Sequence, residues 1–237
     1  YIAEGLARER GFTLKLVNAD EIETALDAAT AVLMLTHVNY RTGAMHDMAA
    51  LSAAAHAAGS LVVWDLAHSA GAVEVNLNAA DADFAVGCGY KYLNGGPGAP
   101  AFLWVHPRHH NQALQPLTGW YGHAAPFAFT PHYEAVKGIS QYLCGTPPVI
   151  STAAFECGLD AFEASLPHGG MKALREKSLA LTDLFIELVE TRCAGHGFAL
   201  ITPREHAKRG SQICLNHPTH GYAIMQAMIA RGGIGDY

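Results

Sequence analysis

The chain has 237 residues, of which 15 are Lys or Arg and 21 are Asp or Glu, and 50% are hydrophobic. Its charged fraction of 15% lies below the roughly 25% typical of soluble domains, so apolar material suffices for a core and global disorder is excluded. A net charge of −6 argues against a nucleic-acid-binding surface, because phosphate binding needs clustered Lys and Arg. A membrane span is not expected, because prolines, glycines and histidines interrupt the longest uncharged stretch.

Cysteine and histidine usage gives no sign of a disulfide scaffold or a metal site. The five cysteines are widely spaced and form no CxxC pair, which predicts free thiols in a reducing cytoplasm. None of the 14 histidines lies in an HExxH motif. The adjacent pair His109 and His110 follows a proline, and we expect it in a surface loop.

The first half of the chain predicts alternating helices and strands. Helices are expected at 2–10, 20–29 and 45–58, and strands at 12–17, 31–36, 60–65, 83–87 and 101–105. The strands at 31–36 and 60–65 are apolar at nearly every position, which indicates burial on both faces. Repeated β-α-β units with such strands predict an α/β fold, with a mainly parallel sheet flanked by helices.

The second half begins with a long irregular stretch, 106–148, which is rich in aromatic residues. A stretch of this length usually serves a site or an interface. Helices are then expected at 151–162, 171–193 and 221–231, and strands at 198–202 and 211–215. We therefore expect one large domain over residues 1–170. Residues 171–237 would form a linking helix and the start of a small α+β domain.

Polar residues follow the ends of three predicted strands, where parallel sheets bind their ligands. Lys91 lies there in a Gly-rich, apolar context, which would favour its neutral, nucleophilic amine. Taken alone, such a lysine more often reaches solvent. Asp65 ends a buried strand and needs a cationic or donor partner. Pyridoxal 5'-phosphate (PLP) would join the two, because its aldehyde reacts with an amine and its ring nitrogen needs a carboxylate. The pair predicts a PLP site.

Other polar side chains offer hydrogen bonds to a phosphate group. Thr36 and Thr146 have hydroxyls, Tyr90 has a phenol and Trp120 has an indole N–H. Each is weak evidence by itself, since a threonine beside a proline-rich turn is most often a turn residue.

Five segments in this order closely resemble the kynureninase family. They are LTHVNYRTG at 35–43, WDLAHSAGA at 64–72, YKYLNGGPG at 90–98, LTGWYGH at 117–123 and YLCGTP at 142–147. The resemblance continues through TPREHAKRGS at 202–211 to the last residue, so it covers essentially the whole chain.

This resemblance implies a fold-type I PLP enzyme, with PLP held as a covalent aldimine on Lys91. Asp65 would pair with the pyridine nitrogen and His68 would lie beside the cofactor. Tyr90 and Trp120 would bind the phosphate, and Thr36 and Thr146 would also contact the cofactor. Tyr90 is the candidate proton donor. The implied reaction, part of tryptophan catabolism and carried out by a homodimer, is hydrolysis of L-kynurenine to anthranilate and L-alanine. The family pattern does not decide between kynurenine and its 3-hydroxy form.

The family pattern also includes groups that these 237 residues lack. It has an N-terminal portion of the large domain, with threonines for the phosphate and an aromatic residue over the cofactor ring. It also has an arginine for the substrate carboxylate. We therefore expect an internal fragment that is inactive alone. The alternatives are a cysteine desulfurase, another class-V PLP enzyme, or an inactive truncated scaffold. A nucleotide-binding Rossmann domain is not expected, because no GxGxxG follows the early strands.

Overall fold

The computed structural model describes residues 1–112 and 115–237. The first part contains α1 (Ile2–Arg10), α2 (Ile22–Ala25), β1 (Val32–Thr36), α3 (Met48–Ala57), β2 (Leu61–Asp65), β3 (Phe84–Cys88) and β4 (Ala101–Val105). The second part contains α4 (Val149–Ser165), α5 (Gly170–Arg192), β5 (Ala199–Leu200), β6 (Leu215–Asn216) and α6 (Gly221–Ile229). Within these residues, no helix is both long and apolar enough to cross a membrane.

Strands β1 to β4 form one sheet in chain order. The first three are parallel, with Thr36 opposite Asp65 and Asp65 opposite Val86. β4 pairs with β3 in the antiparallel direction, because the two are joined by a loop without a crossover helix. The prediction of an α/β fold with a mainly parallel sheet is confirmed.

The core lies between one face of the sheet and α3. Trp64 of β2 is fully buried there, and its indole N–H donates to Ser52 Oγ on α3 at 3.1 Å. The alanines of α3 let the helix approach the sheet closely. The side chains that join Trp64 in this cluster include Leu33, Met48, Leu51, Ala55, Val62 and Ala85.

The opposite face of the sheet is partly open. Val32 and Met34 on β1 and Leu61 on β2 are exposed there. The expectation that these strands are buried on both faces was therefore wrong for the described residues. Every second side chain of β1 and β2 packs toward α3. The side chains that point the other way have no covering layer among the described residues.

Helix boundaries follow local capping chemistry. α1 ends at Gly11, whose φ of 73° is the left-handed conformation that glycine adopts without strain. α3 begins after Asp47, whose Oδ1 accepts a hydrogen bond from the Ala50 N–H at 3.0 Å. It therefore starts at residue 48 rather than 45 as expected.

Two expected elements near the N-terminus were wrong. Residues 12–17 form no strand, and no strand of the sheet pairs with them. The helix expected over 20–29 is a 3₁₀ turn, Ala19–Glu21, followed by the four-residue α2. It ends early because Asp27 folds the chain into a turn, accepting from the Ala29 N–H at 2.9 Å and from the Thr30 hydroxyl at 3.0 Å.

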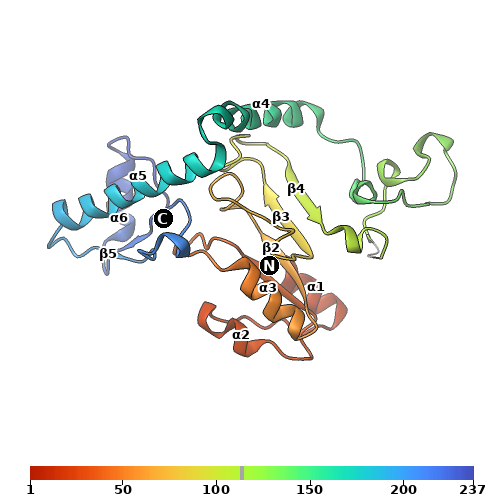
Figure 1. Ribbon diagram of the computed structural model, residues 1–237, viewed down its shortest axis with the longest axis horizontal. Coiled ribbons are helices and arrows are strands. Elements are labelled where there is room, and N and C mark those ends of the chain that lie inside the picture. The colour runs from red at the N-terminus through yellow and green to blue at the C-terminus, as the bar shows by residue number, and fades with distance from the viewer. Residues whose placement is uncertain (113–114) are drawn as a thin grey trace.

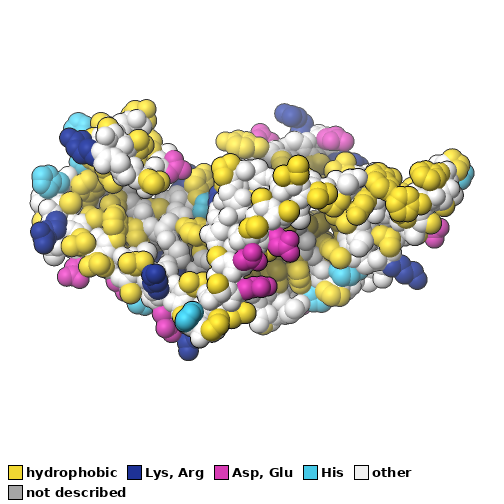
Figure 2. All heavy atoms as spheres, turned by 90° about the horizontal axis from the view of Figure 1, so that it is seen from above, with side chains coloured by type: hydrophobic (Ala, Val, Ile, Leu, Met, Phe, Trp, Pro, Cys, Tyr) yellow, Lys and Arg dark blue, Asp and Glu magenta, His cyan; other side chains and the backbone are white. Residues whose placement is uncertain are grey.

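Residues 106–148 are largely irregular, as predicted, and where described they form an arm that projects beyond the sheet (Figure 1). Hydrophobic side chains gather along this arm in the space-filling view (Figure 2). Its exposed large apolar side chains are Leu117, Trp120, Tyr121, Phe127, Phe129, Tyr133, Ile139 and Leu143.

The C-terminal part contains α5, the short antiparallel pair β5 and β6, and α6. Only the last residue of the strand expected over 211–215 lies in β6, because the side chains before it bond to other segments. The hydrophobic stripe expected on α5 is present, but Leu181, Leu184 and Phe185 are exposed. The boundary near residue 170 stays a prediction.

A buried carboxylate anchors the other end of the sheet. Asp83 is 1% exposed and accepts hydrogen bonds from the Val62 N–H, His56 Nε2 and His109 Nε2, each at 2.7–2.8 Å. Arg108 forms an ion pair with it at 2.6 Å. The expectation that His109 lies in a surface loop was wrong: it belongs to a 3₁₀ turn that closes over Asp83.

Candidate active site

The candidate site lies at the carboxyl ends of β1, β2 and β3. Asp65 is the last residue of β2 and is half-buried. Its Oδ1 accepts a hydrogen bond from the Ala67 N–H at 2.8 Å, which fixes the carboxylate at the start of the turn that carries His68. Among the described residues, no hydrogen-bond donor reaches its Oδ2 atom.

Lys91 and His68 meet at this edge. The Lys91 Nζ atom lies 3.2 Å from His68 Nε2, and both side chains are half-buried. Burial lowers the pKa of His68, and the positive charge of Lys91 lowers it further, while the Asp65 carboxylate opposes both effects. Because His68 stays neutral, its Nε2 can accept a hydrogen bond from the lysine amine.

Close backbone contacts fix the turn that carries Lys91. The Gly95 N–H donates to the Gly89 carbonyl at 2.9 Å, and Asn94, in a left-handed conformation with φ of 63°, donates its N–H to the Lys91 carbonyl at 3.0 Å. Helix α4 packs on this turn, because an added Cβ at Gly89 would lie 3.1 Å from the Phe155 ring. The amine is therefore presented by a constrained loop.

Tyr90 and Thr36 lie near this edge, but neither hydroxyl bonds to Lys91. The Tyr90 side chain is 50% exposed, and the Lys91 ammonium lies 5.4 Å from the centre of its ring. The Thr36 hydroxyl donates to the Val38 carbonyl at 2.9 Å. Their roles toward a cofactor stay predictions.

The other two expected residues lie on the arm. Trp120 packs edge-on against Tyr121 and Phe127, and its side chain is 47% exposed. Thr146 is also exposed, shortly before α4. The described hydrogen bonds connect neither residue to Lys91, His68 or Asp65, so the structure gathers Thr36, Asp65, His68, Tyr90 and Lys91 but not these two.

One residue of this edge was not predicted from the sequence. Tyr40, in the turn after β1, stacks on His68 with ring centres 6.1 Å apart and ring planes at 26°. Tyr40 lies within the first of the family-like segments, but nothing in its spacing indicates a contact with His68.

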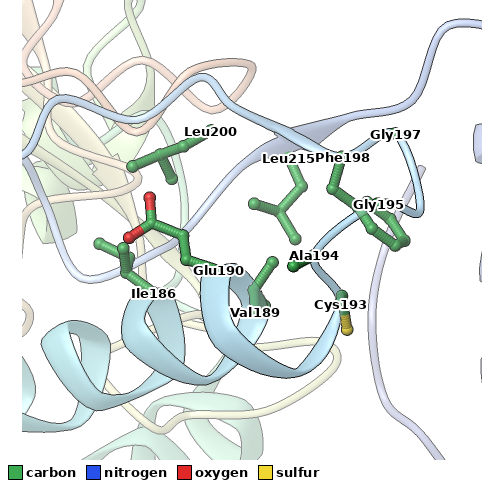
Figure 3. Close-up of a pocket in the computed structure, with 10 residues that line it drawn as sticks. All are labelled: Ile186, Val189, Glu190, Cys193, Ala194, Gly195, Gly197, Phe198, Leu200 and Leu215. Carbon is green, nitrogen blue, oxygen red and sulfur yellow. The ribbon is translucent and has the colours of Figure 1, made fainter.

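A separate shallow pocket lies in the C-terminal part, between the end of α5 and strands β5 and β6 (Figure 3). Of the described residues that line it, Glu190 alone is charged, and the others are mainly apolar. It contains none of the expected site residues. Among the described residues, no group of three or more His, Cys, Asp or Glu side chains is placed to hold a metal ion.

Comparison with known proteins identifies the relatives of the chain. It is 60% identical over 240 residues to a kynureninase from Pseudomonas fluorescens, and 57% identical to one from Burkholderia mallei. The chain is homologous to kynureninases over its whole length. A family model described as the kynureninase C-terminal domain matches residues 174–237. The chain spans 56% of the length of these curated relatives.

Solved structures share the fold of the chain. The apo cysteine desulfurase from Thermococcus onnurineus NA1 matches 98% of this chain and 57% of its own, with 20% identity and a TM-score of 0.78. A C-DES variant with glycine covalently linked to its PLP cofactor matches 98% of this chain and 62% of its own, with 16% identity and a TM-score of 0.79. The fold expected from the resemblance is confirmed by these structures. At these identities the two structures support the fold alone, whereas the kynureninases are 57–60% identical over the whole of this chain.

Proposed function

We propose that this chain is the part of a kynureninase that carries the cofactor lysine, and that the enzyme hydrolyses L-kynurenine to anthranilate and L-alanine. One observation supports this most strongly. The Lys91 amine, its His68 partner and the Asp65 carboxylate lie at one sheet edge, in a chain 60% identical to a kynureninase along its length.

The residues at this edge fit PLP. Lys91 offers a half-buried amine for the aldehyde, and Asp65 has a carboxylate oxygen, Oδ2, that no described donor occupies. A protonated pyridine nitrogen is a partner that suits this half-buried carboxylate. Lys91 and Asp65 would therefore hold the two ends of the cofactor ring, with His68 beside it. Thr36 and Tyr90 flank them.

When bound, PLP supplies an electron sink for the carbanion left after bond cleavage. The chain's own residues then handle protons. We assign to the free Lys91 amine the removal of the proton from the substrate α-carbon, with His68 accepting a hydrogen bond from the amine to orient it. One water is consumed as the bond between Cβ and the carbonyl carbon breaks and anthranilate leaves. The Tyr90 phenol is our candidate donor of the proton that completes L-alanine.

We also propose that the enzyme is a cytoplasmic homodimer acting in tryptophan catabolism. The arm that carries Trp120 and Thr146 exposes many aromatic and aliphatic side chains, and clustered exposed apolar side chains mark interaction surfaces. A second copy covering this surface would bring Trp120 and Thr146 toward a phosphate group. All five cysteines are free thiols, which fits a reducing compartment.

A chimeric enzyme tests the proposed reaction. The 240-residue matching segment of the Pseudomonas fluorescens kynureninase would be replaced by this chain, and anthranilate formation from L-kynurenine would be followed by its fluorescence. We expect the chimera to form anthranilate and its Lys91→Ala variant to form none. L-alanine should appear in equal amount, because the reaction splits one substrate into these two products.

The same chimera can also contradict the proposed reaction. A chimera that folds and takes up PLP but releases no anthranilate would contradict the proposal and favour an inactive scaffold. Release of sulfide or alanine from L-cysteine instead would favour the desulfurase alternative. Comparing L-kynurenine with its 3-hydroxy form in the same assay would give the substrate preference.

A further inference from the structure

Tyr40 connects the candidate site to the C-terminal part of the chain. Its ring stacks on the His68 imidazole, and His68 in turn contacts the Lys91 amine at 3.2 Å. The Tyr40 side chain is 64% exposed, so one face of its ring covers His68 while the rest meets solvent. Tyr40 therefore contributes to the site more than to the core.

The main chain of Tyr40 is held from a segment far along the sequence. The Gln212 side-chain amide donates to the Tyr40 carbonyl at 2.5 Å, and the Cys214 thiol lies 3.7 Å from the same oxygen. Each contact joins the turn after β1 to the stretch between α5 and β6. The position of Tyr40 thus depends on how this stretch docks.

That docking is close and specific. The Gly210 N–H donates to the Gly43 carbonyl at 2.9 Å, and the Met45 N–H donates to the Lys208 carbonyl at 2.9 Å. An added Cβ at Gly210 would lie 2.5 Å from the Val38 Cγ1 atom, so the backbone of this stretch packs directly on the Val38 side chain, as only a glycine permits. Residues 208–212 therefore run alongside the turn after β1 and are joined to it by backbone hydrogen bonds.

We propose that Tyr40 is a positioning residue for Lys91, held in place by Gln212 so that docking of segment 208–214 fixes His68 against the lysine amine. The proposal rests on the proposed function of Lys91. Its physical basis is the flexibility of lysine: a four-carbon stem holds one rotamer only when a partner fixes its amine. His68 is that partner, and Tyr40 limits the rotation of the His68 ring.

The stacking also shields His68 from water. Burial is the main cause of the lowered pKa of His68, followed by the charge of Lys91, with Asp65 acting in the opposite direction. Removing the Tyr40 ring would expose one face of the imidazole. The pKa of His68 should then rise toward its ordinary value of 6.5.

Two readouts on the Pseudomonas fluorescens chimera, which supplies the parts of the enzyme outside this chain, test this role. The first is the rate at which PLP labels Lys91, trapped by borohydride at successive times and located by peptide mass spectrometry, with exposed Lys15 as the internal standard. The second is the titration of His68 by NMR, which needs no cofactor. For Tyr40→Ala we expect labelling of Lys91 relative to Lys15 to fall about two- to tenfold, the range that aromatic pairs provide. We also expect an upward shift of the His68 titration.

Matched variants separate positioning from a general loss of structure. Tyr40→Phe keeps the ring and should match the wild-type chain in both readouts. Gln212→Ala should shift both in the direction of Tyr40→Ala, whereas Tyr222→Ala, an exposed tyrosine in α6, should change neither. An unchanged His68 titration in a folded Tyr40→Ala variant would overturn the proposal. If wild-type Lys91 labels no faster than Lys15, the proposed function fails instead, and the NMR titration alone decides the role of Tyr40.

Discussion

The Nζ atom of Lys91 and the Nε2 atom of His68 lie 3.2 Å apart, close enough for the amine to donate to the imidazole. An ammonium group only donates, so the pair is favourable when His68 is neutral. Burial and the charge of Lys91 lower the pKa of His68 and so favour that neutral form, against the influence of Asp65. The two residues therefore act as one unit.

Replacing His68 should leave the Lys91 amine without its partner. For His68→Ala we expect labelling of Lys91 by PLP to fall about fivefold, the equivalent of about 1 kcal/mol, which is the net value of a typical hydrogen bond that orients the neutral amine. His68→Gln should recover part of this loss, because its amide oxygen can also accept. Equal rates for wild type and His68→Ala would show that the 3.2 Å contact has no effect on the amine.

Asp83 should be a major contributor to stability. Burial alone would raise the pKa of Asp83, but hydrogen bonds from His109, His56 and Arg108 outweigh it and hold this pKa well below its usual range. For Asp83→Asn we expect a loss of about 2–3 kcal/mol in the free energy of unfolding, measured in urea. The loss is smaller than for a fully buried ion pair, because Arg108 is partly exposed.

Asp81 provides the matched control for Asp83. It also pairs with Arg108, but its side chain is 60% exposed. Asp81→Asn should therefore cost less than about 1 kcal/mol. Similar losses for the two variants would contradict the central role of the buried carboxylate.

The buried His37 should make the chain less stable in mild acid. Burial, with a smaller effect of His46, lowers the pKa of His37 from 6.5 to about 4. The unfolded chain thus binds more protons between these values, so stability should fall as the pH drops from 6.5 toward 4. At about 1.4 kcal/mol per unit, His37 accounts for up to about 3 kcal/mol. Urea unfolding across this pH range should show the slope, and His37→Phe should flatten it.

Gly71 should tolerate no side chain. Its φ is 85°, and an added Cβ would lie 2.5 Å from the Tyr92 carbonyl oxygen, next to the Lys91 turn. We expect Gly71→Ala to lower the free energy of unfolding by about 3 kcal/mol, because backbone strain and a clash act together. Gly59 has a similar φ of 83° with open space around it, so Gly59→Ala should cost about 1 kcal/mol. Thermal or urea unfolding of both variants measures these losses. Equal losses would show that the close contact with the Tyr92 carbonyl adds nothing to the strain at Gly71.

The sequence predicts the elements whose signals are local. The apolar runs of β1 and β2, the alanine-rich α3 and the left-handed cap at Gly11 are all recognisable from neighbouring residues. Asp65 and Lys91 could be chosen as site residues because they follow apolar strands, and parallel sheets bind ligands at the carboxyl ends of their strands. These features need no knowledge of distant contacts.

Features that depend on distant segments could not be predicted. The contact of Tyr40 with His68 depends on how two turns fold, and the burial of Asp83 depends on His109 returning from beyond β4. β4 shows the same limit, since its composition does not set its direction. Trp120 is identifiable by its motif, but its place in a 3₁₀ turn of the irregular stretch 106–148 is a property of the fold.

We propose above that Lys91 is the cofactor lysine of a kynureninase. The most direct test is to add PLP to the Pseudomonas fluorescens chimera, fix it with borohydride and map the labelled peptide by mass spectrometry. We expect a pyridoxyl group on Lys91, and loss of both the label and anthranilate formation in Lys91→Ala. A label on another lysine, or anthranilate formation by the Lys91→Ala chimera, would contradict it.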